Sequence, residues 1–280
     1  MTARVVSGRT ALYLALAVMA AILLVPMVML LSYSLRDNGE IVSVDVRFFP
    51  RVWTLAAFLR AFTRNWQGFS FLRSALNSVA LNGASAILAT YVAALGGYGF
   101  VRYRFWGKRL LFFTIFFTQV MPWIVLLIPY YTILVSVKML DTLAGLFVSY
   151  LIINIPVSAW LFIGFFKNQP ASLEEAARID GSSVMTVFHR IVLPLAAPGL
   201  SAIVLFAFIN GWGDFLFSSV LVSSARNLTL PLFLQSFRGD HYIDWATIMA
   251  VAVFMTVPIA VLFLALQKQL VNMMAGSLKE

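Results

Sequence analysis

The sequence predicts an all-α, polytopic membrane protein with six transmembrane helices. Of its 280 residues, 61% are hydrophobic and 11% are charged, whereas charged residues make up about 25% of an average soluble domain. Six uncharged segments each exceed the roughly 20 residues that a helix needs to cross the hydrocarbon core. Runs of this length are too long for barrel strands, so helices must satisfy the backbone in lipid. The segments are residues 11–35, 74–101, 110–137, 142–166, 191–213 and 245–267.

The first segment is expected to stay anchored in the membrane. Arg4 and Arg9 precede it as in a secretory signal, but its apolar run is too long for a signal core and lacks a small-residue cleavage site. With the N-terminus inside, the inner connections hold eleven of the 20 Lys and Arg residues and the outer ones nine. This bias and the basic cluster at 102–109 favour a cytoplasmic N-terminus.

The composition also excludes several classes of function. The chain has no cysteine and two histidines, so neither a disulfide framework nor a metal site is expected. The net charge of +9 comes from basic residues scattered over the connections rather than from one basic face, so we expect no nucleic-acid partner. No segment carries paired carboxylates or a nucleophile–base pattern, and no enzymatic activity is predicted.

The connection between the fourth and fifth segments predicts a short helix outside the hydrocarbon core. Ser172 and Glu175 have the spacing of a capping box, in which each side chain binds the other residue's backbone N–H. Glu174 and Glu175 in the first turn suit the positive end of the helix dipole, and Gly181 stands where a left-handed residue ends a helix. A second short helix is expected over residues 183–191.

The same connection carries a recognisable pattern of residues. It reads E-A-A, three residues, G, nine residues, I, one residue, and then L-P. This pattern resembles the E-A-A…G…I-L-P signature of the permease subunits of ATP-binding-cassette (ABC) importers. The matching positions are Glu175, Ala176, Ala177, Gly181, Ile191, Leu193 and Pro194.

Most of the remaining chain resembles the carbohydrate subfamily of these permeases. Within that subfamily it is similar to the six-helix permease of maltose-type importers, a group that includes glycerol-3-phosphate systems. The resemblance implies the type I ABC importer permease fold with a cytoplasmic coupling helix, and a sugar or related polyol as substrate. The stretches that carry it are Asn77-Ser78, 99–112, Pro122, Ile128-Pro129, 140–142 and 271–279.

The resemblance also implies how the chain is organised. Residues 1–10 would be a cytoplasmic N-terminus, 11–267 the transmembrane domain with its coupling loop at 167–198, and 268–280 a cytoplasmic tail. The protein would lie in a bacterial-type cell (inner) membrane. Its partners would be two ABC ATPase subunits, a second related permease and an extracytoplasmic solute-binding protein. Because no Gly-rich phosphate-binding loop of the Walker type occurs, ATP and Mg would be bound by the ATPase subunits and no cofactor by this chain.

The residues expected to couple this chain to an ATPase lie along the signature loop. In the family, the short helix docks in a groove on the ATPase subunit. Small side chains permit close approach there, and charged ones can pair with the partner. The expected coupling residues are Glu174, Glu175, Ala176, Ala177, Arg178, Asp180, Gly181, Ile191, Leu193 and Pro194.

Polar residues inside the apolar segments are candidates for the substrate path. Asp214 is the only ionisable residue with apolar sequence on both sides, and a carboxylate at membrane depth is a functional candidate because its desolvation is costly. Alternatively, it caps a helix that Gly211 and Gly213 loosen near the outer surface. The family's W-N-E-F is replaced by Trp212-Gly-Asp-Phe215, so roles of its Asn and Glu do not carry over. The candidates are Asn154, Asn210, Trp212, Asp214 and Gln119.

An ion- or proton-coupled secondary transporter of small solutes is the alternative function. Such a protein would need inverted repeats with broken helices at matching positions, but Pro122 and Pro129 have no counterpart three segments later. The sequence leaves sugars, polyols and glycerol phosphodiesters all open as substrates.

Overall fold

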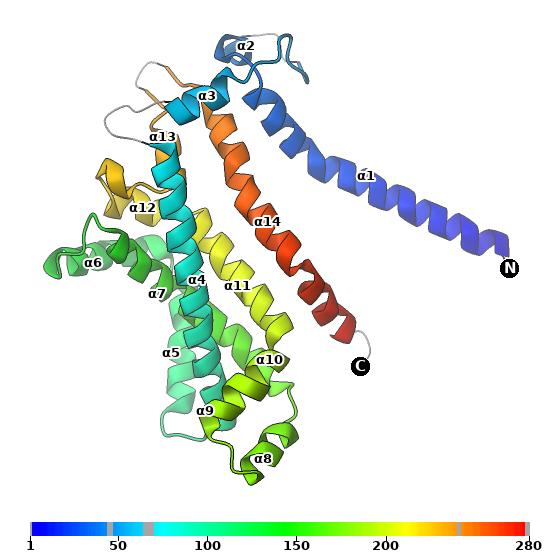
Figure 1. Ribbon diagram of the computed structural model, residues 1–280, viewed down its shortest axis with the longest axis vertical. Helices are drawn as coiled ribbons and strands as arrows, with labels where there is room; N and C mark the ends of the chain where they lie inside the picture. The colour runs from blue at the N-terminus through cyan, green and yellow to red at the C-terminus, as the bar shows by residue number, and fades with distance from the viewer. Residues whose placement is uncertain (1, 44–46, 64–69, 240–241, 278–280) are drawn as a thin grey trace. The chain divides into compact units, whose positions relative to one another are not determined.

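The computed structural model describes residues 2–43, 47–63, 70–239 and 242–277, with side chains between residues 11 and 269 of these ranges. The regular secondary structure of the described residues is helical, apart from an isolated antiparallel bridge between Arg238 and Ile243. Its elements are α-helices, which Figure 1 labels, and two short turns of π and 3-10 type. They are α1 (Thr2–Ser34), α2 (Asn38–Val42), α3 (Ala56–Thr63), α4 (Phe71–Arg102), α5 (Lys108–Val120), α6 (Trp123–Ser136), α7 (Leu143–Lys167), α8 (Ser172–Ile179), α9 (Val184–Val187), the π-helical turn η1 (Phe188–Val192), α10 (Leu193–Leu195), α11 (Ala197–Trp212), α12 (Leu216–Leu221), the 3-10 turn η2 (Ala225–Asn227), α13 (Leu230–Gln235) and α14 (Trp245–Ser277).

Within the described residues, four helices are long and apolar enough to cross a membrane by themselves. They are α4, α7, the segment Ala11–Ser34 of α1 and the segment Trp245–Gln269 of α14. Two further spans arise if each of two bent helix pairs is one span, α5 with α6 and Val184–Leu195 with α11. The structure therefore has four to six candidate spans, and the bends fall in the predicted third and fifth segments.

The predicted third segment, residues 110–137, is not one straight helix. α5 and α6 are bent by 103° with respect to each other. Proline disfavours helical backbone in the residue before it, and Met121 before Pro122 is extended, with φ −72° and ψ 131°. A new helix then begins at Trp123, with Pro122 as its N-cap.

The predicted fifth segment, residues 191–213, is not one straight helix either. The helical stretch Val184–Leu195 is bent by 81° from α11, which begins at Ala197. Pro198 stands in the first turn of α11 and has no N–H to bond the carbonyl of Pro194 four residues earlier. A straight helix through this point would lose that bond, so the chain turns there.

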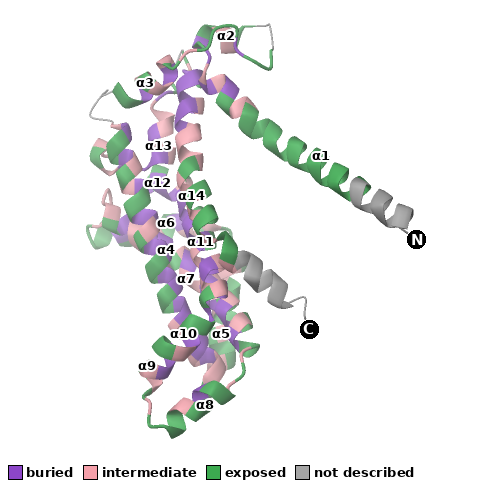
Figure 2. Ribbon diagram, turned by 45° about the vertical axis from the view of Figure 1, so that its right-hand side comes forward, coloured by how far each residue is buried: buried purple, intermediate pink, exposed green. Residues whose placement is uncertain are grey.

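The chain divides into two compact units, residues 1–66 with 234–257 and residues 67–233 with 258–280. In the second unit, α4 packs against α7 and α11, and Figure 2 shows the buried residues along these helices. A Cβ at Gly97 of α4 would lie 2.7 Å from Cβ of Phe162 in α7, so glycine is needed for this approach. Small residues at such contacts hold membrane helices together, because lipid tails supply no hydrophobic driving force between them.

In the first unit, the short amphipathic helix α3 packs on the start of α14. Ala57 of α3 is buried together with Ala246 and Ala250 of α14. Arg60 of α3 donates from Nε to Oδ2 of Asp244 at 3.0 Å. The apolar window of α1, in contrast, has no buried residue, and most of this helix is coloured as exposed in Figure 2.

Candidate functional site

The predicted short helix of the signature loop is α8. Its N-cap is Ala171, and no side chain caps it, so the predicted capping box of Ser172 is wrong. The predicted C-terminal end is confirmed, because Gly181 has φ +85° and the N–H of Ser182 bonds the carbonyl of Ala177 at 3.0 Å. This bond pattern closes a helix with a left-handed residue. A Cβ at Gly181 would meet open space, so its backbone conformation, not crowding, favours glycine.

One face of α8 is directed into the protein by Glu174. Its Oε1 accepts from Nε of Arg102 at 2.8 Å and lies 2.7 Å from that residue's second guanidinium nitrogen. Its Oε2 accepts from Oη of Tyr98 at 3.0 Å. Three residues later on the same face, Ala177 is half-buried against the apolar cluster that includes Phe166. This face is held by α4 through polar bonds and by the core through apolar contact.

The rest of the α8 surface is exposed. Leu173 is 50% exposed and Ile179 is 87% exposed. Exposed apolar groups with charged neighbours are typical of a surface that binds another protein. The charged or small coupling candidates that share this exposure are Glu175, Ala176, Arg178, Asp180 and Gly181.

The second half of the signature packs on the apolar cluster that α8 also contacts. Ser183 caps α9, as its Oγ accepts from the N–H of Thr186 at 3.2 Å. Ile191 and Leu193 are half-buried on the same apolar cluster as Ala177, while Pro194 is exposed. The signature residues therefore divide between packing and an exposed surface.

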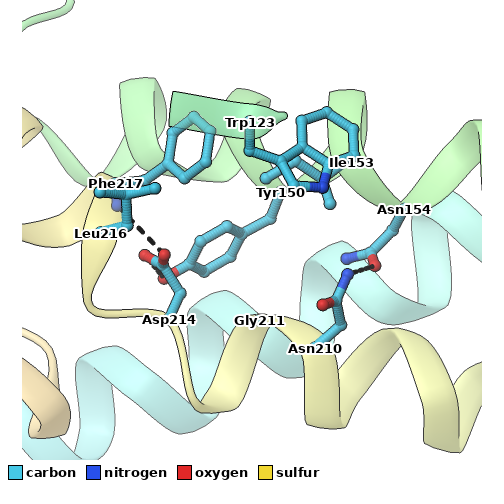
Figure 3. A pocket seen from close by; sticks show the side chains of 9 residues that line it. All are labelled: Trp123, Tyr150, Ile153, Asn154, Asn210, Gly211, Asp214, Leu216 and Phe217. Atoms are coloured by element: carbon cyan, nitrogen blue, oxygen red, sulfur yellow. Dashed lines mark hydrogen bonds between the residues drawn. The ribbon is translucent and has the colours of Figure 1, made fainter. Parts of the chain in front are cut away.

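A polar pocket lies between α6, α7, α11 and the start of α12 (Figure 3). Its cavity volume is about 130 Å³. Trp123 contributes an indole ring, and Tyr150 and Asp214 contribute a hydroxyl and a carboxylate. The complete lining is Trp123, Tyr150, Ile153, Asn154, Asn210, Gly211, Asp214, Leu216 and Phe217.

Asp214 both lines this pocket and binds the first turn of α12. Its carboxylate accepts N–H bonds from Phe217 at 3.1 Å and from Ser218 at 3.0 Å, and Oη of Tyr150 donates to Oδ2 at 3.1 Å. Asp214 therefore binds the helix that follows it, α12. The alternative interpretation had it capping the helix that contains Gly211, which is α11. Among the described residues no Lys or Arg forms an ion pair with it.

The amide candidates join two helices at the pocket wall. Nδ2 of Asn210 in α11 donates to Oδ1 of Asn154 in α7 at 2.9 Å, and Nδ2 of Asn154 donates to the carbonyl of Ala207 at 3.3 Å. Asn154 is buried and Asn210 is exposed, so Asn210 is the more accessible of the pair.

Two candidates for the substrate path lie outside the pocket, and the lining includes residues that were not candidates, among them Tyr150. Trp212 is buried and stacks on Phe208 with ring centroids 5.2 Å apart, and Gln119 on α5 donates to Thr118 at 3.3 Å. Tyr150 was not a candidate, although it stands four residues before Asn154 and so shares its helix face. That spacing was the available signal.

Comparison with known proteins gives the class of protein. The family described as "binding-protein-dependent transport system inner membrane component" matches residues 85–275, and the chain belongs to this family. It is 32% identical over 276 residues to the maltodextrin transport system permease protein MdxG of Bacillus subtilis (strain 168), covering 95% of each chain. The predicted resemblance to ABC importer permeases is thereby confirmed, and the chain is a multi-pass inner-membrane component of a transport system.

Solved structures agree on the fold. A bacterial ABC transporter that imports the acidic polysaccharide alginate contains a chain with a TM-score of 0.75, at 20% identity, covering 96% of this chain and 98% of that one. A bacterial alginate ABC transporter in complex with an alginate pentasaccharide-bound periplasmic protein gives a TM-score of 0.65, at 14% identity, covering 92% and 93%. The fold is that of an ABC importer permease.

Proposed function

We propose that this chain forms half of the membrane pathway of an ATP-driven importer and couples it to an ATPase subunit through α8. The observation that carries the proposal is the exposed face of α8. Leu173 and Ile179 present apolar surface there, and Glu175, Arg178 and Asp180 present charges beside it. Such a surface suits a partner with an apolar groove and a polar rim.

The topology proposed is six spans with both termini in the cytoplasm, each bent helix pair being one span. Arg102, in the last turn of α4, pairs with Glu174 of α8, so α8 and the loop after α4 lie at the same end of α4. That short loop and its flanks carry Arg102, Arg104, Lys108 and Arg109. Because basic residues concentrate in cytoplasmic loops, the pairing favours a cytoplasmic α8.

The partners proposed follow from this assignment. Two ABC ATPase subunits would bind ATP and Mg, and this chain would bind neither. A second related permease would complete the pathway, and an extracytoplasmic solute-binding protein would deliver the substrate. The structural relative that contains a periplasmic protein bound to an alginate pentasaccharide supports the last partner.

A variant at Gly181 tests the coupling. Gly181→Arg combines a large charged side chain with a left-handed backbone that disfavours non-glycine residues, so the ATPase should no longer co-purify with the tagged chain. Gly181→Asn is the matched control, because Asn tolerates that backbone, and it should retain the ATPase. Mass spectrometry of the purified complex measures both.

Two results would contradict the proposal. One is co-purification of the ATPase with Gly181→Arg at the level of the unmodified chain. The other is solute uptake that continues after ATP is depleted, because this outcome favours the ion- or proton-coupled secondary transporter instead.

We propose a sugar or related polyol as the substrate and the polar pocket as its contact on this chain. Sugar hydroxyls can donate to a carboxylate and exchange hydrogen bonds with amides, and the face of a sugar ring can lie on an indole. Trp123, Asn210 and Asp214 offer these groups together. The relative MdxG is named for maltodextrin transport. Screening the cognate binding protein against sugars, polyols and glycerol phosphodiesters would identify the ligand.

A further inference from the structure

Glu174 and Glu175 are neighbours of the same chemical type, but the fold treats them differently. Glu174 is 6% exposed, whereas Glu175 is exposed. About 100° of helix rotation separates adjacent residues, so the two carboxylates point to different sides of α8. Only Glu175 is available to a partner that docks on the exposed face.

The environment of Glu174 satisfies both of its carboxylate oxygens. The Arg102 guanidinium approaches Oε1 through two nitrogens, at 2.8 and 2.7 Å, and Oη of Tyr98 donates to Oε2 at 3.0 Å. Arg102 also donates to the carbonyl of Gln169, just before α8, at 3.0 Å. Side-chain exposure is 17% for Arg102 and 9% for Glu174, so solvent screens this ion pair weakly.

The partners of Glu174 belong to α4, the helix that packs against both α7 and α11. Tyr98 and Arg102 are four residues apart in the last turns of α4, so they lie on one face of it. α4 packs against α7 and α11, and these two helices carry the amide pair of the polar pocket. A displacement of α8 would therefore act directly on the end of α4.

We propose that Glu174 is a positioning residue that ties the coupling helix to α4 through Arg102 and Tyr98, so that movement of α8 is passed to the membrane helices. This inference rests on the proposed function, since it assumes that an ATPase moves α8. The exposed face binds the ATPase, and the Glu174 face transmits the movement. The half-buried Ala177 supplies the apolar part of the same inner contact.

The test separates binding of the ATPase from transmission of its movement. The complete complex, with its ATPases and binding protein, is reconstituted in liposomes, and uptake and ATP hydrolysis are measured together. Glu174→Ala should retain the ATPase and its hydrolysis, while the uptake per ATP hydrolysed falls by about tenfold. The charge-swapped double variant Arg102→Glu/Glu174→Arg should recover much of this ratio, because it restores the attraction with the signs reversed.

Glu175→Gln is the matched comparison on the same helix, and it should weaken retention of the ATPase rather than the uptake per ATP. Tyr98→Phe removes one hydrogen bond and leaves the ion pair, so the ratio should fall by about two- to threefold. This conservative variant decides the question if Glu174→Ala does not fold.

Three outcomes would overturn the inference. The first is uptake per ATP hydrolysed that is unchanged in Glu174→Ala or, where that variant does not fold, in Tyr98→Phe. Glu174→Ala could lose the ATPase as fully as Gly181→Arg, which would make Glu174 a docking residue. Failure of the unmodified complex to retain an ATPase or to transport with ATP would refute the proposed function itself, and it is distinguished because it needs no variant.

Discussion

Two acidic residues in different regions of the second unit are each held by a tyrosine, but they are neutralised differently. Glu174 accepts from Tyr98 and forms an ion pair with Arg102. Asp214 accepts from Tyr150 and from backbone N–H groups at the start of α12, with no cation beside it among the described residues. A paired carboxylate fixes two elements together, whereas one held by dipoles alone keeps its negative charge available to a ligand.

The two regions therefore suit different roles in transport. The loop that contains α8 combines an anchored face with an exposed one, which suits transmission of movement. The pocket combines a carboxylate with an exposed amide and an indole, which suits recognition of hydroxyl groups. Substitutions at each carboxylate and at its partners distinguish these two roles.

The largest effect is expected from removal of the cation beside Glu174. Arg102→Ala leaves a carboxylate that is 9% exposed without its ion pair, and breaking a buried pair in this way costs about 3–5 kcal/mol. The thermal unfolding midpoint of the purified complex should fall markedly. Arg102→Lys keeps the positive charge but has one nitrogen where arginine brings two to Glu174. The unfolding midpoint should therefore fall less in this variant than in Arg102→Ala. Equal midpoints for Arg102→Ala and the unmodified chain would show that Glu174 needs no partner.

A smaller effect, on transport rather than stability, is expected at Asp214. Asn binds a helix N-terminus about as well as Asp, so Asp214→Asn removes the charge while its amide oxygen still accepts one of the two N–H bonds from α12. If the charge contacts the substrate, uptake at low substrate concentration should fall by about tenfold or more, the range for a hydrogen bond to a charged group.

Asp214→Ala is the comparison for that variant, because it removes both the charge and the bonds to α12. Transport should be impaired in both variants, with ATPase retention unchanged in Asp214→Asn. Normal transport by Asp214→Asn together with impaired transport by Asp214→Ala would show that the residue only supports the helix.

The smallest effect is expected at a third carboxylate, Asp141, in the connection before α7. It has left-handed backbone, with φ +56°, and accepts N–H bonds from Ser223 and Ser224 at 2.9 Å each. Burial alone would raise the pKa of Asp141, but hydrogen bonds from Ser224, Ser223 and Asn227 outweigh it and hold the pKa below its ordinary value. The carboxylate thus ties two connections by accepting hydrogen bonds in its ionised form.

The direction of the pH dependence follows from that lowered pKa. A group whose pKa is lower in the folded chain stabilises it above the ordinary carboxyl pKa, and this contribution is lost as the pH falls through the folded value. Asp141→Asn should therefore lower the unfolding midpoint at pH 7 by an amount equivalent to about 1 kcal/mol. The difference from the unmodified chain should shrink in melts below about pH 4. A difference that stays constant with pH would show that ionisation of Asp141 is irrelevant.

Much of the fold was predictable because lipid imposes simple rules on sequence. Long uncharged runs correctly located the helices around 11–35, 74–101, 142–166 and 245–267, since each must satisfy its own backbone. The runs at 110–137 and 191–213 were read as single helices, and both bend at prolines. Apolar composition shows how much of the chain can enter lipid, but it gives no information on the direction of the helix axis. It therefore did not reveal these bends.

The signature loop shows the same division at the level of single residues. Gly181 was predicted to be left-handed from local chemistry alone, and it is. The capping box failed because Ala171 supplies the N-cap and Ser172 lies inside the helix. The burial of Glu174 was not predicted, because its partners Tyr98 and Arg102 are more than 70 residues earlier in the chain.

By itself, the sequence determined that this is an integral membrane protein, that its chain is helical, and that a short helix carries the importer signature. Each of these depends on composition or on contacts between near neighbours. Only the tertiary structure decided which glutamate of α8 faces inward, and that Tyr150, Asn154, Asn210 and Asp214 line one pocket. Those arrangements depend on how α4, α7 and α11 pack, and helix packing brings together residues whose distance in sequence gives no sign of contact.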